Sequence, residues 1–443
     1  MTVREFLLHL LLLCQIVSTS YRGDKVYRLS LSTEVDVKDI LSFITETRDY
    51  LDYWQTELHV GGHVDVRLSR QQDELLSSHH LRNISHTVQI EDVQKLLNKV
   101  SHYGRGRTKR STSDDEADYS YTRFNNPAAT HREMYRLAAQ YPNLTRLVGV
   151  GSTHQGRPLL VMEIVGLKKE RNCPMVWVDG GLHAREWITV AATMLFIKKL
   201  LEGYGTDPYI TDMLDSTKFA IQPLANPDGY AYSWNSERLW RKNRSPTSVA
   251  WCKGVDLNRN FDINFGGQGA SDFSCSEIYN GPNAFSEHES KGIARYLSSV
   301  RHKLLGYFSL HSYGQMWLTP LSYTRKKVTD RTEHLDVAHI ATRKIKEATG
   351  QKYSYGPATA LMYVTSGDSS DWVYSELNCS HTYGIELGDM GRYGFLLPPS
   401  HIRPTSNVIL SGVLAAVEVI AAGPDNLTTP RRQRKYKRRK WRN

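Results

Sequence analysis

The chain has 443 residues and a formal net charge of +10. A chain of this length is too long for one ordinary domain, and its size predicts two or three folded units. The charge is misleading, because nine positive charges and no acid lie in residues 431–442, so that the rest of the molecule is close to neutral.

Residues 1–20 have the pattern of a removable secretory signal. Arg4 precedes an apolar run at residues 6–13, and small residues that suit cleavage follow at 18–20. The apolar run is too short to span a bilayer. We therefore expect a secreted, extracellular protein, with an uncleaved anchor as the alternative.

Four cysteines remain after Cys14 leaves with the signal: Cys173, Cys252, Cys275 and Cys379. An even number in an oxidising compartment favours disulfides over reactive thiols or zinc–thiolate sites. Glycosylation sequons fit the same route, and they begin at Asn83, Asn143, Asn243, Asn378 and Asn426. We discount Asn243, because Pro246 follows its sequon.

Residues 21–110 are expected to form a small α+β pro-domain with its connecting segment. Alternating apolar residues predict strands at 25–31, 63–68 and 88–90, and helical spacing predicts helices at 35–51, 71–81 and 93–100. Two strand–helix–strand passages indicate an antiparallel sheet with helices on one face.

A segment without apolar periodicity joins this unit to the next. Residues 104–110 are basic and residues 111–116 are polar and acidic, as in an exposed linker. Arg107-Thr-Lys-Arg110 is the pattern that secretory-pathway convertases cut, and an exposed position favours cleavage. We expect processing after Arg110; the alternative is a merely solvated basic loop.

Residues 111–423 alternate between strand and helix patterns, which predicts an α/β sheet with helices on both faces. Predicted strands lie at 158–164, Met175–Asp179, Lys218–Gln222, 304–310 and Thr382–Leu387. The last apolar run, at 408–423, is short and carries Glu418, so we expect a helix packed on the domain and no membrane span.

Residues 424–443 form a basic tail. A block of like charge is typical of an extension outside the fold. In a secreted protein we expect residues 431–443 to bind heparan-sulfate-like polyanions or other acidic surfaces, and not nucleic acid. The alternative is a solvated tail without a specific partner.

The pentad at residues 183–187 carries the most chemical information. His183 and Glu186 follow the strand Met175–Asp179 and precede a buried helix predicted at 187–201. Open α/β sheets place their sites where a strand gives way to a loop. A second histidine from a neighbouring strand end would complete a His₂Glu zinc site with an open position.

Five separate stretches, in matching order and spacing, resemble the A/B-type zinc metallocarboxypeptidases, which are secreted zymogens with an inhibitory pro-domain. The stretches are residues 181–188, 238–242, 254–260, 310–313 and 386–395. The resemblance covers nearly the whole chain. It implies a mixed, mostly parallel eight-stranded sheet with helices on both faces, preceded by a small antiparallel pro-domain. It also implies an enzyme that removes the C-terminal residue of peptides and proteins.

Matched residue by residue, His311 is the third ligand of one Zn²⁺ per chain, beside His183 and Glu186. Three protein ligands leave the open position that zinc catalysis needs. Asp256 matches the acid that accepts a hydrogen bond from His183 and fixes its ring. Without the resemblance, a lone histidine after an apolar strand would be read as a packed side chain.

Two further matches supply catalytic groups. Glu386 matches the general base, which takes a proton from the attacking water and passes it to the leaving amine. Arg241 matches the cation that stabilises the tetrahedral oxyanion. On composition alone, Glu386 would be a solvent-facing acid and Arg241 a surface arginine.

Asn258, Arg259 and Tyr363 match the residues that grip the terminal carboxylate of the substrate. The planar fork of arginine suits this task, because it meets both carboxylate oxygens. Arg185 and Tyr313 match further substrate contacts.

The resemblance also pairs Cys252 with Cys275, a disulfide that would rigidify the loop after Asn258-Arg259. Cys173 and Cys379 have no clear counterpart. A second bridge between them stays open, unless their separation across the sheet forbids it.

Substrate preference is where the sequence departs from the family. Ser370, at the bottom of the predicted specificity pocket, is neither the apolar residue of A-type members nor the aspartate of B-type members. Asp368 stands where both usually have glycine. Pointing inward it would pair with Lys or Arg, whereas pointing outward it would leave a neutral pocket. The other wall positions are Leu318, Ser322, Ala358, Met362, Thr365 and Gly384.

These walls are roomy and mildly apolar, and an unpaired pocket carboxylate is costly unless hydrated. We therefore expect A-like or broad specificity, with B-like specificity through Asp368 as the alternative. A non-catalytic matrix- or peptide-binding protein with this fold would lack Glu386, Arg241 or a zinc ligand, and none is missing. We expect an active monomer that acts on peptide C-termini.

Overall fold

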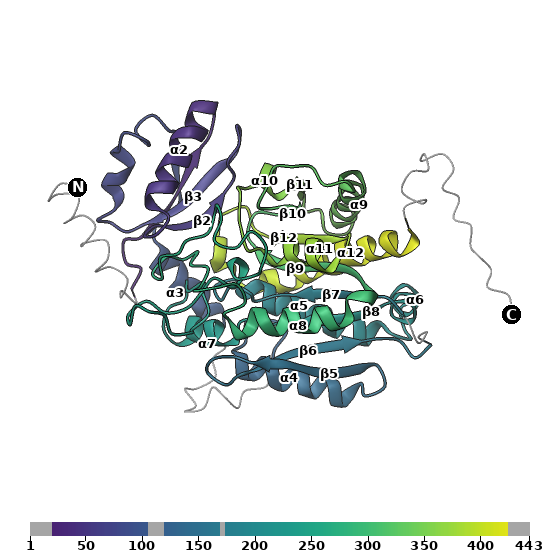
Figure 1. Ribbon diagram of the computed structural model, residues 1–443. Helices are drawn as coiled ribbons and strands as arrows, with labels where there is room; N and C mark the ends of the chain where they lie inside the picture. Colours follow the sequence, from purple (N-terminus) through teal and green to yellow (C-terminus); the bar gives the residue numbers. More distant parts are fainter. Residues whose placement is uncertain (1–19, 105–118, 169–172, 424–443) are drawn as a thin grey trace.

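The computed structural model describes residues 20–104, 119–168 and 173–423. The signal, the cleavage site at Arg110, the sequon at Asn426 and the basic tail lie outside the described residues. A small sheet unit at residues 20–104 rests on a larger α/β unit at residues 119–423 (Figure 1).

The first unit is an antiparallel sheet with the strand order β2-β3-β1-β4. Its strands are β1 (Lys25–Ser30), β2 (Asp52–Thr56), β3 (His63–Leu68) and β4 (His86–Ile90), and its helices are α2 (Glu34–Thr47) and α3 (Val93–Gly104). Thr33 and Asp36 form a capping box at the start of α2. Ile40 and Phe43 of α2 pack on one face of the sheet.

The opposite face of this sheet lies against the larger unit. Successive residues of a strand point to opposite faces, so Leu29 of β1 faces α2 while Val26 faces the larger unit. Val26 and Trp54 share a buried cluster with Tyr313 and Phe395. The two units are therefore joined by a common apolar core.

Two predictions for the first unit are wrong. The helix predicted at 71–81 is only the short 3-10 turn η2 (Asp73–Ser77), because the backbone becomes extended at Ser78 (φ −61°, ψ 160°). Leu75, Leu76 and Leu81 also lack the three-to-four spacing of a helix face. The helix predicted at 35–51 ends at Thr47, and the chain enters β2, a strand that the sequence reading missed.

The larger unit has eight strands in the order β11-β10-β12-β9-β7-β8-β6-β5. They are β5 (Thr145–Ser152), β6 (Pro158–Ile164), β7 (Met175–Asp179), β8 (Lys218–Gln222), β9 (Leu304–Ser312), β10 (Met316–Thr319), β11 (Ser354–Pro357) and β12 (Thr382–Leu387). The central run β12-β9-β7-β8 is parallel throughout. The predicted mixed, mostly parallel eight-stranded sheet is confirmed.

Helices cover both faces of this sheet, as predicted (Figure 1). They are α4 (Pro127–Gln140), α5 (Trp187–Gly203), α6 (Pro208–Ser216), α7 (Pro227–Asn235), α8 (His288–Val300), α9 (Arg331–Thr349), α10 (Ala358–Leu361), α11 (Ser369–Leu377) and α12 (Ile402–Ala422). Val176 and Val178 of β7 share a core with α4, α5, α6, α9 and α12, whereas Met175 and Trp177 share one with α8 and α11. A central strand buried on both faces has this pattern.

The last helix packs on the domain. Residues Pro399–Ala422 are long and apolar enough to cross a membrane, but within an 18-residue window of mean hydropathy 1.7, 61% is buried. The helix contacts α5 and α9. The packed helix predicted at 408–423 is confirmed, although α12 begins earlier, at Ile402.

Candidate metal centre and substrate pocket

The loop between β7 and α5 carries the pentad found in the sequence. After β7 the chain turns at Gly181 (φ +67°), where an added Cβ would lie 2.7 Å from Cγ2 of Val190. The positive φ and this close approach together require glycine. The turn brings His183 and Glu186 to the C-terminal edge of the sheet, and α5 begins directly after Glu186.

His311 and Glu386 reach the same edge on neighbouring strands. β9 and β12 pair in parallel, with His311 opposite Glu386. Residues directly opposite each other project from the same face of a sheet. Because β9 also pairs with β7, the sheet register brings residues from three distant segments to one place.

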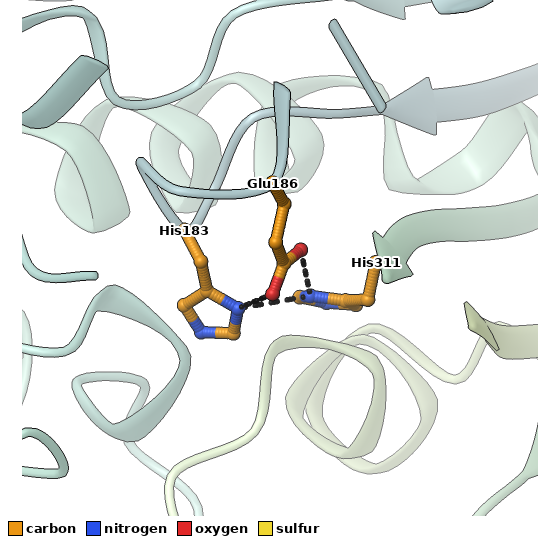
Figure 2. Close-up of side chains that lie close together, drawn as sticks. All are labelled: His183, Glu186 and His311. Atoms are coloured by element: carbon orange, nitrogen blue, oxygen red, sulfur yellow. Dashed lines mark hydrogen bonds and ion pairs between the residues drawn. The ribbon is translucent and has the colours of Figure 1, made fainter. Parts of the chain in front are cut away.

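Three of these side chains converge (Figure 2). Nδ1 of His183 lies 2.8 Å from Oε1 of Glu186 and 3.2 Å from Nδ1 of His311, and the latter atom lies 3.3 Å from Oε2 of Glu186. All three residues are buried, and their donor atoms lie within 4.8 Å of one another. Two imidazole nitrogens and one carboxylate oxygen are a donor set that suits Zn²⁺.

The contacts within this group control its charge. Burial opposes ionisation of Glu186, but His183 and His311 hold the pKa of that carboxyl below its usual range. Burial also opposes the charged form of His311, yet the hydrogen bond and charge of Glu186 raise the pKa of His311 to about 9. Glu186 and His311 therefore stabilise each other's charged forms.

Asp256 connects His183 to an arginine. Its Oδ1 lies 3.1 Å from Nε2 of His183, and its Oδ2 accepts hydrogen bonds from Nε and Nη2 of Arg241 at 3.0 and 2.8 Å. Despite complete burial, Arg241, Arg259 and His183 hold the pKa of Asp256 well below its usual range. The carboxylate therefore fixes both the His183 ring and the Arg241 guanidinium.

Arg241 and Glu386 line the same cavity as the three converging side chains. Burial opposes the charge of Arg241, but Asp256 raises the pKa of Arg241, so the guanidinium stays charged. Burial raises the pKa of Glu386, and the charge of His311 only partly opposes this. A carboxyl group with a raised pKa can both take and give a proton near neutral pH.

Asn258, Arg259 and Tyr363 come together at another wall of the cavity. Arg259 donates from Nη2 to the Tyr363 hydroxyl at 3.1 Å and from Nε to the Gly269 carbonyl at 2.8 Å. Gly367 (φ +74°) allows the next loop to approach, because a Cβ there would lie 2.2 Å from the Arg259 carbonyl oxygen. The structure thus groups the three residues predicted to grip a carboxylate.

Asp368 faces Asn258 and the start of α11. Its Oδ2 accepts a hydrogen bond from Nδ2 of Asn258 at 2.8 Å. Its Oδ1 accepts from the backbone N–H groups of Ser370 and Asp371 at 2.8 and 3.3 Å, and also from the Ser370 hydroxyl. Asp368 is therefore the N-cap residue of α11. Both Asp368 and Ser370 line the cavity, but the carboxylate is held by its neighbours.

The cavity has a volume of about 150 Å³ and contains every predicted wall position, namely Leu318, Ser322, Ala358, Met362, Thr365 and Gly384. The first unit covers its mouth with residues Ile44, Arg48, Leu51, Tyr53, Trp54, Gln55 and Thr56. The larger unit therefore carries the residues predicted for the chemistry, and the smaller unit covers them.

The two remaining predicted substrate contacts are occupied by the first unit. Nη1 of Arg185 donates to Oδ1 of Asp52 at 2.7 Å, and the Tyr313 hydroxyl donates to Oδ2 of Asp65 at 2.9 Å. Arg185 and Tyr313 are 2% and 1% exposed, so neither is open to a substrate in this state. Sequence reasoning missed both aspartates; the one available signal was Asp65, an acid between two valines of a predicted strand.

The structure contains the one disulfide that the resemblance implied. Cys252 and Cys275 form a disulfide with a Cα–Cα distance of 4.9 Å. Cys173 and Cys379 are buried and free, so the second bridge is not formed. Asn243 is also fully buried, and its Nδ2 donates to two buried glutamates, which agrees with discounting its sequon.

Comparison with known sequences gives matches over both units. Residues 130–410 match the family described as zinc carboxypeptidase, and residues 27–99 match the family described as carboxypeptidase activation peptide. Carboxypeptidase A1 of Bos taurus is 35% identical over 415 residues, which cover 93% of this chain and 97% of that protein.

Comparison with solved structures agrees. The crystal structure of thrombin activatable fibrinolysis inhibitor matches with a TM-score of 0.77 and 31% identity, covering 90% of this chain and 99% of that one. Carboxypeptidase A from Helicoverpa armigera matches with a TM-score of 0.81 and 25% identity, covering 91% of this chain and 99% of that one. The likeness thus extends over the small sheet unit as well as the larger α/β unit.

Proposed function

The chain belongs to the zinc carboxypeptidase family and carries its activation peptide, and from this we propose which residues perform the reaction. His183, Glu186 and His311 hold one Zn²⁺ per chain. When bound, this ion supplies Lewis acidity, which acidifies water and polarises a carbonyl group. The observation that carries the assignment is the convergence of three buried donor groups beside Glu386 in one cavity.

Glu386 is the general base, and Arg241 stabilises the developing charge. Glu386 takes a proton from the attacking water and then delivers it to the amine that leaves. Its position opposite His311 on the neighbouring strand, in the same cavity, supports this role. Arg241, held in place and kept charged by Asp256, stabilises the oxyanion of the tetrahedral intermediate.

The grouping of Asn258, Arg259 and Tyr363 makes the enzyme an exopeptidase. These side chains bind the terminal carboxylate of a peptide, and so place its last peptide bond beside Glu386. Arg259 suits this role because its guanidinium is already held by the Tyr363 hydroxyl and two carbonyl oxygens. After activation, Arg185 and Tyr313 contact the peptide upstream of this bond.

We propose A-like or broad specificity. Four hydrogen bonds from neighbouring groups engage both oxygens of Asp368, which leaves it poorly placed to pair with a Lys or Arg side chain. The other cavity walls are small or apolar, as at Ala358, Met362 and Gly384. The alternative, preference for C-terminal Lys or Arg, rests on the position of Asp368 at the cavity surface.

The covered cavity supports a secreted zymogen. We propose a signal at residues 1–20, a pro-domain at 21–110, an enzyme domain at 111–423 and a basic tail at 424–443. In this arrangement Asp52 and Asp65 occupy Arg185 and Tyr313 until cleavage after Arg110 releases the pro-domain.

The activity is tested on the purified zymogen after convertase treatment, with peptides that end in Phe, Leu, Lys or Glu. We expect release of the last residue alone, fastest for Phe and Leu. Glu386→Gln, with unchanged zinc content, is the matched inactive control. A folded, zinc-loaded wild-type protein that releases no residue would contradict the proposal and favour a non-catalytic peptide-binding protein.

The nine positive charges at residues 431–442 support binding to heparan-sulfate-like polyanions. We expect heparin to retain the protein in a salt-dependent way, and a chain that ends at residue 430 to lose that retention. Equal retention of both forms would place the polyanion site elsewhere. Light scattering of the same samples tests the expected monomer.

A further inference from the structure

The amide of Asn258 is held at both ends. Its Oδ1 accepts a hydrogen bond from the backbone N–H of Ser369 at 2.9 Å, and its Nδ2 donates to Oδ2 of Asp368 at 2.8 Å. Asn258 is 6% exposed and lines the cavity. The backbone N–H of Asn258 in turn donates to Asp256 at 3.0 Å. The residue is therefore fixed by three contacts, one of which comes from Asp368.

Asp368 determines which end of the amide faces which partner. If the amide were reversed, Oδ1 would face the Asp368 carboxylate and Nδ2 would face the Ser369 N–H. An acceptor would then oppose an acceptor and a donor would oppose a donor. The observed orientation is thus the one compatible with both neighbours, and it keeps the second N–H of Nδ2 available for another acceptor.

That second N–H matters because Arg259, the next residue, is proposed to bind the terminal carboxylate of the substrate. Resting on the proposed carboxylate-binding role of Asn258, Arg259 and Tyr363, we propose that Asp368 is a positioning residue. It orients the Asn258 amide so that an N–H, and not the carbonyl oxygen, meets the terminal carboxylate of every substrate. It is not a counter-ion for the substrate side chain.

The surroundings of Asp368 fit this role better than a counter-ion role. Both of its oxygens are engaged by hydrogen bonds from neutral groups, namely Asn258, Ser370 and the backbone N–H of Asp371. The N-terminus of α11 offsets about half a unit of negative charge. This offset limits the repulsion between Asp368 and a bound carboxylate, so we expect the orienting effect to dominate.

A double-mutant cycle tests the link between the two residues. Asp368→Ser keeps a preferred N-cap residue at the start of α11 but has no group that reaches Asn258. We expect Asp368→Ser to raise KM about tenfold, with kcat changed less than about threefold, as for loss of a charge-assisted contact. The same change should appear for peptides that end in Phe, Leu and Lys. In an Asn258→Ala background, Asp368→Ser should have no further effect.

Several results would overturn the proposal. A loss confined to the Lys peptide would make Asp368 a counter-ion, and additive single changes would show that it does not act through Asn258. An unchanged or lower KM, or a lower melting temperature alone, would reduce Asp368 to a helix cap. Asp368→Asn, which also caps helices well, guards against a variant that fails to fold.

A binding measurement separates this proposal from the proposed reaction. Calorimetric titration of the activated protein with 3-phenylpropanoate reports on carboxylate binding without hydrolysis. We expect about tenfold weaker binding to Asp368→Ser. If the wild type binds in this Asp368-dependent way but releases no residue, the proposed activity fails and the positioning role stands. If it hydrolyses peptides but the cycle is additive, the positioning role fails and the activity stands.

Discussion

The metal end and the specificity end of the same cavity are built in different ways. At the proposed metal end, His311 lies on β9, and His183 and Glu186 lie in the loop after the neighbouring strand β7, so the sheet register brings the three together. At the specificity end, Asp368 and Ser370 lie at the start of a short helix, where hydrogen bonds to near neighbours decide their orientation. The comparison shows that a residue type predicts function well only where the backbone allows its side chain to point in one direction.

The metal end should tolerate no loss. His311→Ala removes one of the three proposed ligands, whose donor atoms lie within 4.8 Å of one another. We expect bound zinc and peptidase activity to fall below detection, because structure and chemistry both depend on the ion. Metal analysis and a peptide assay check this. Substantial activity in a protein with His311→Ala would show that the metal end is not the reaction centre.

Loss of the base should separate binding from chemistry. For Glu386→Gln we expect kcat to fall by about 10²- to 10⁴-fold, the usual range for a general base, with KM changed only a few-fold. Zinc content should stay the same. Glu277→Gln is a matched control, because Glu277 is another acid that lines the cavity. A comparable fall in that control would mean that charge in the cavity, and not proton transfer by Glu386, is being measured.

The cover over the cavity should depend on the buried carboxylate of Asp52. Asp52→Ala leaves Arg185 without its partner at 2.7 Å, although Glu277 at 3.8 Å compensates in part. It also removes the contact of Asp52 with Arg67, which keeps its ion pair with Asp24. Breaking a buried pair costs roughly 3–5 kcal/mol, so with this compensation we expect about a thirtyfold rise in the activity of the uncut zymogen. Glu34→Ala, on the exposed start of α2, should change nothing. Equal latency of both variants would place the restraint in the apolar contacts of Trp54.

The specificity end should accept a change of charge. Ser370→Asp places a carboxylate at the predicted bottom of the pocket, beside the engaged Asp368. We expect the preference for a C-terminal Lys over Phe to rise about tenfold, with some loss of overall rate, because a nearly buried carboxylate is costly without a partner. The ratio of kcat/KM for the two peptides measures this. An unchanged ratio would show that the substrate side chain does not reach Ser370.

The smallest expected effect is on pH. Burial, followed by the charge of Glu277, raises the pKa of Glu237 to about 7, and Arg67 of the pro-domain opposes this in part. A group whose pKa is raised in the folded state contributes stability at low pH, and this contribution is lost as the pH rises through about 7. We expect the melting temperature of the zymogen to be about 2–4 °C lower at pH 8 than at pH 5.5. Thermal unfolding of Glu237→Gln should show a flatter dependence on pH, and an equal dependence in both proteins would contradict this.

The metal end and its sheet were the predictable parts. In β7, β8 and β12 most residues that point to either face of the sheet are apolar, which is typical of central strands. All three strands have the bounds expected from the sequence. The family motifs then named His183, Glu186, His311, Glu386 and Arg241, and the structure brings them to one cavity.

The parts that depend on contacts between distant segments were not predictable. Asp52 lies on β2, which the sequence analysis missed because it placed a helix up to residue 51. Its partner Arg185 is 133 positions away in the sequence. The direction of Asp368 follows from Asn258, which is 110 positions away. No local spacing encodes such pairs, because each is decided by the packing of two elements.

Asp256 ties two separate tasks to a single side chain. One of its oxygens contacts the His183 ring and the other accepts from the Arg241 guanidinium. If His183 holds the metal and Arg241 the oxyanion, as proposed, a substitution of Asp256 disturbs both in one step. Ser370, whose hydroxyl donates to Asp368, touches neither of them, so the bottom of the predicted pocket can vary while this carboxylate stays the same.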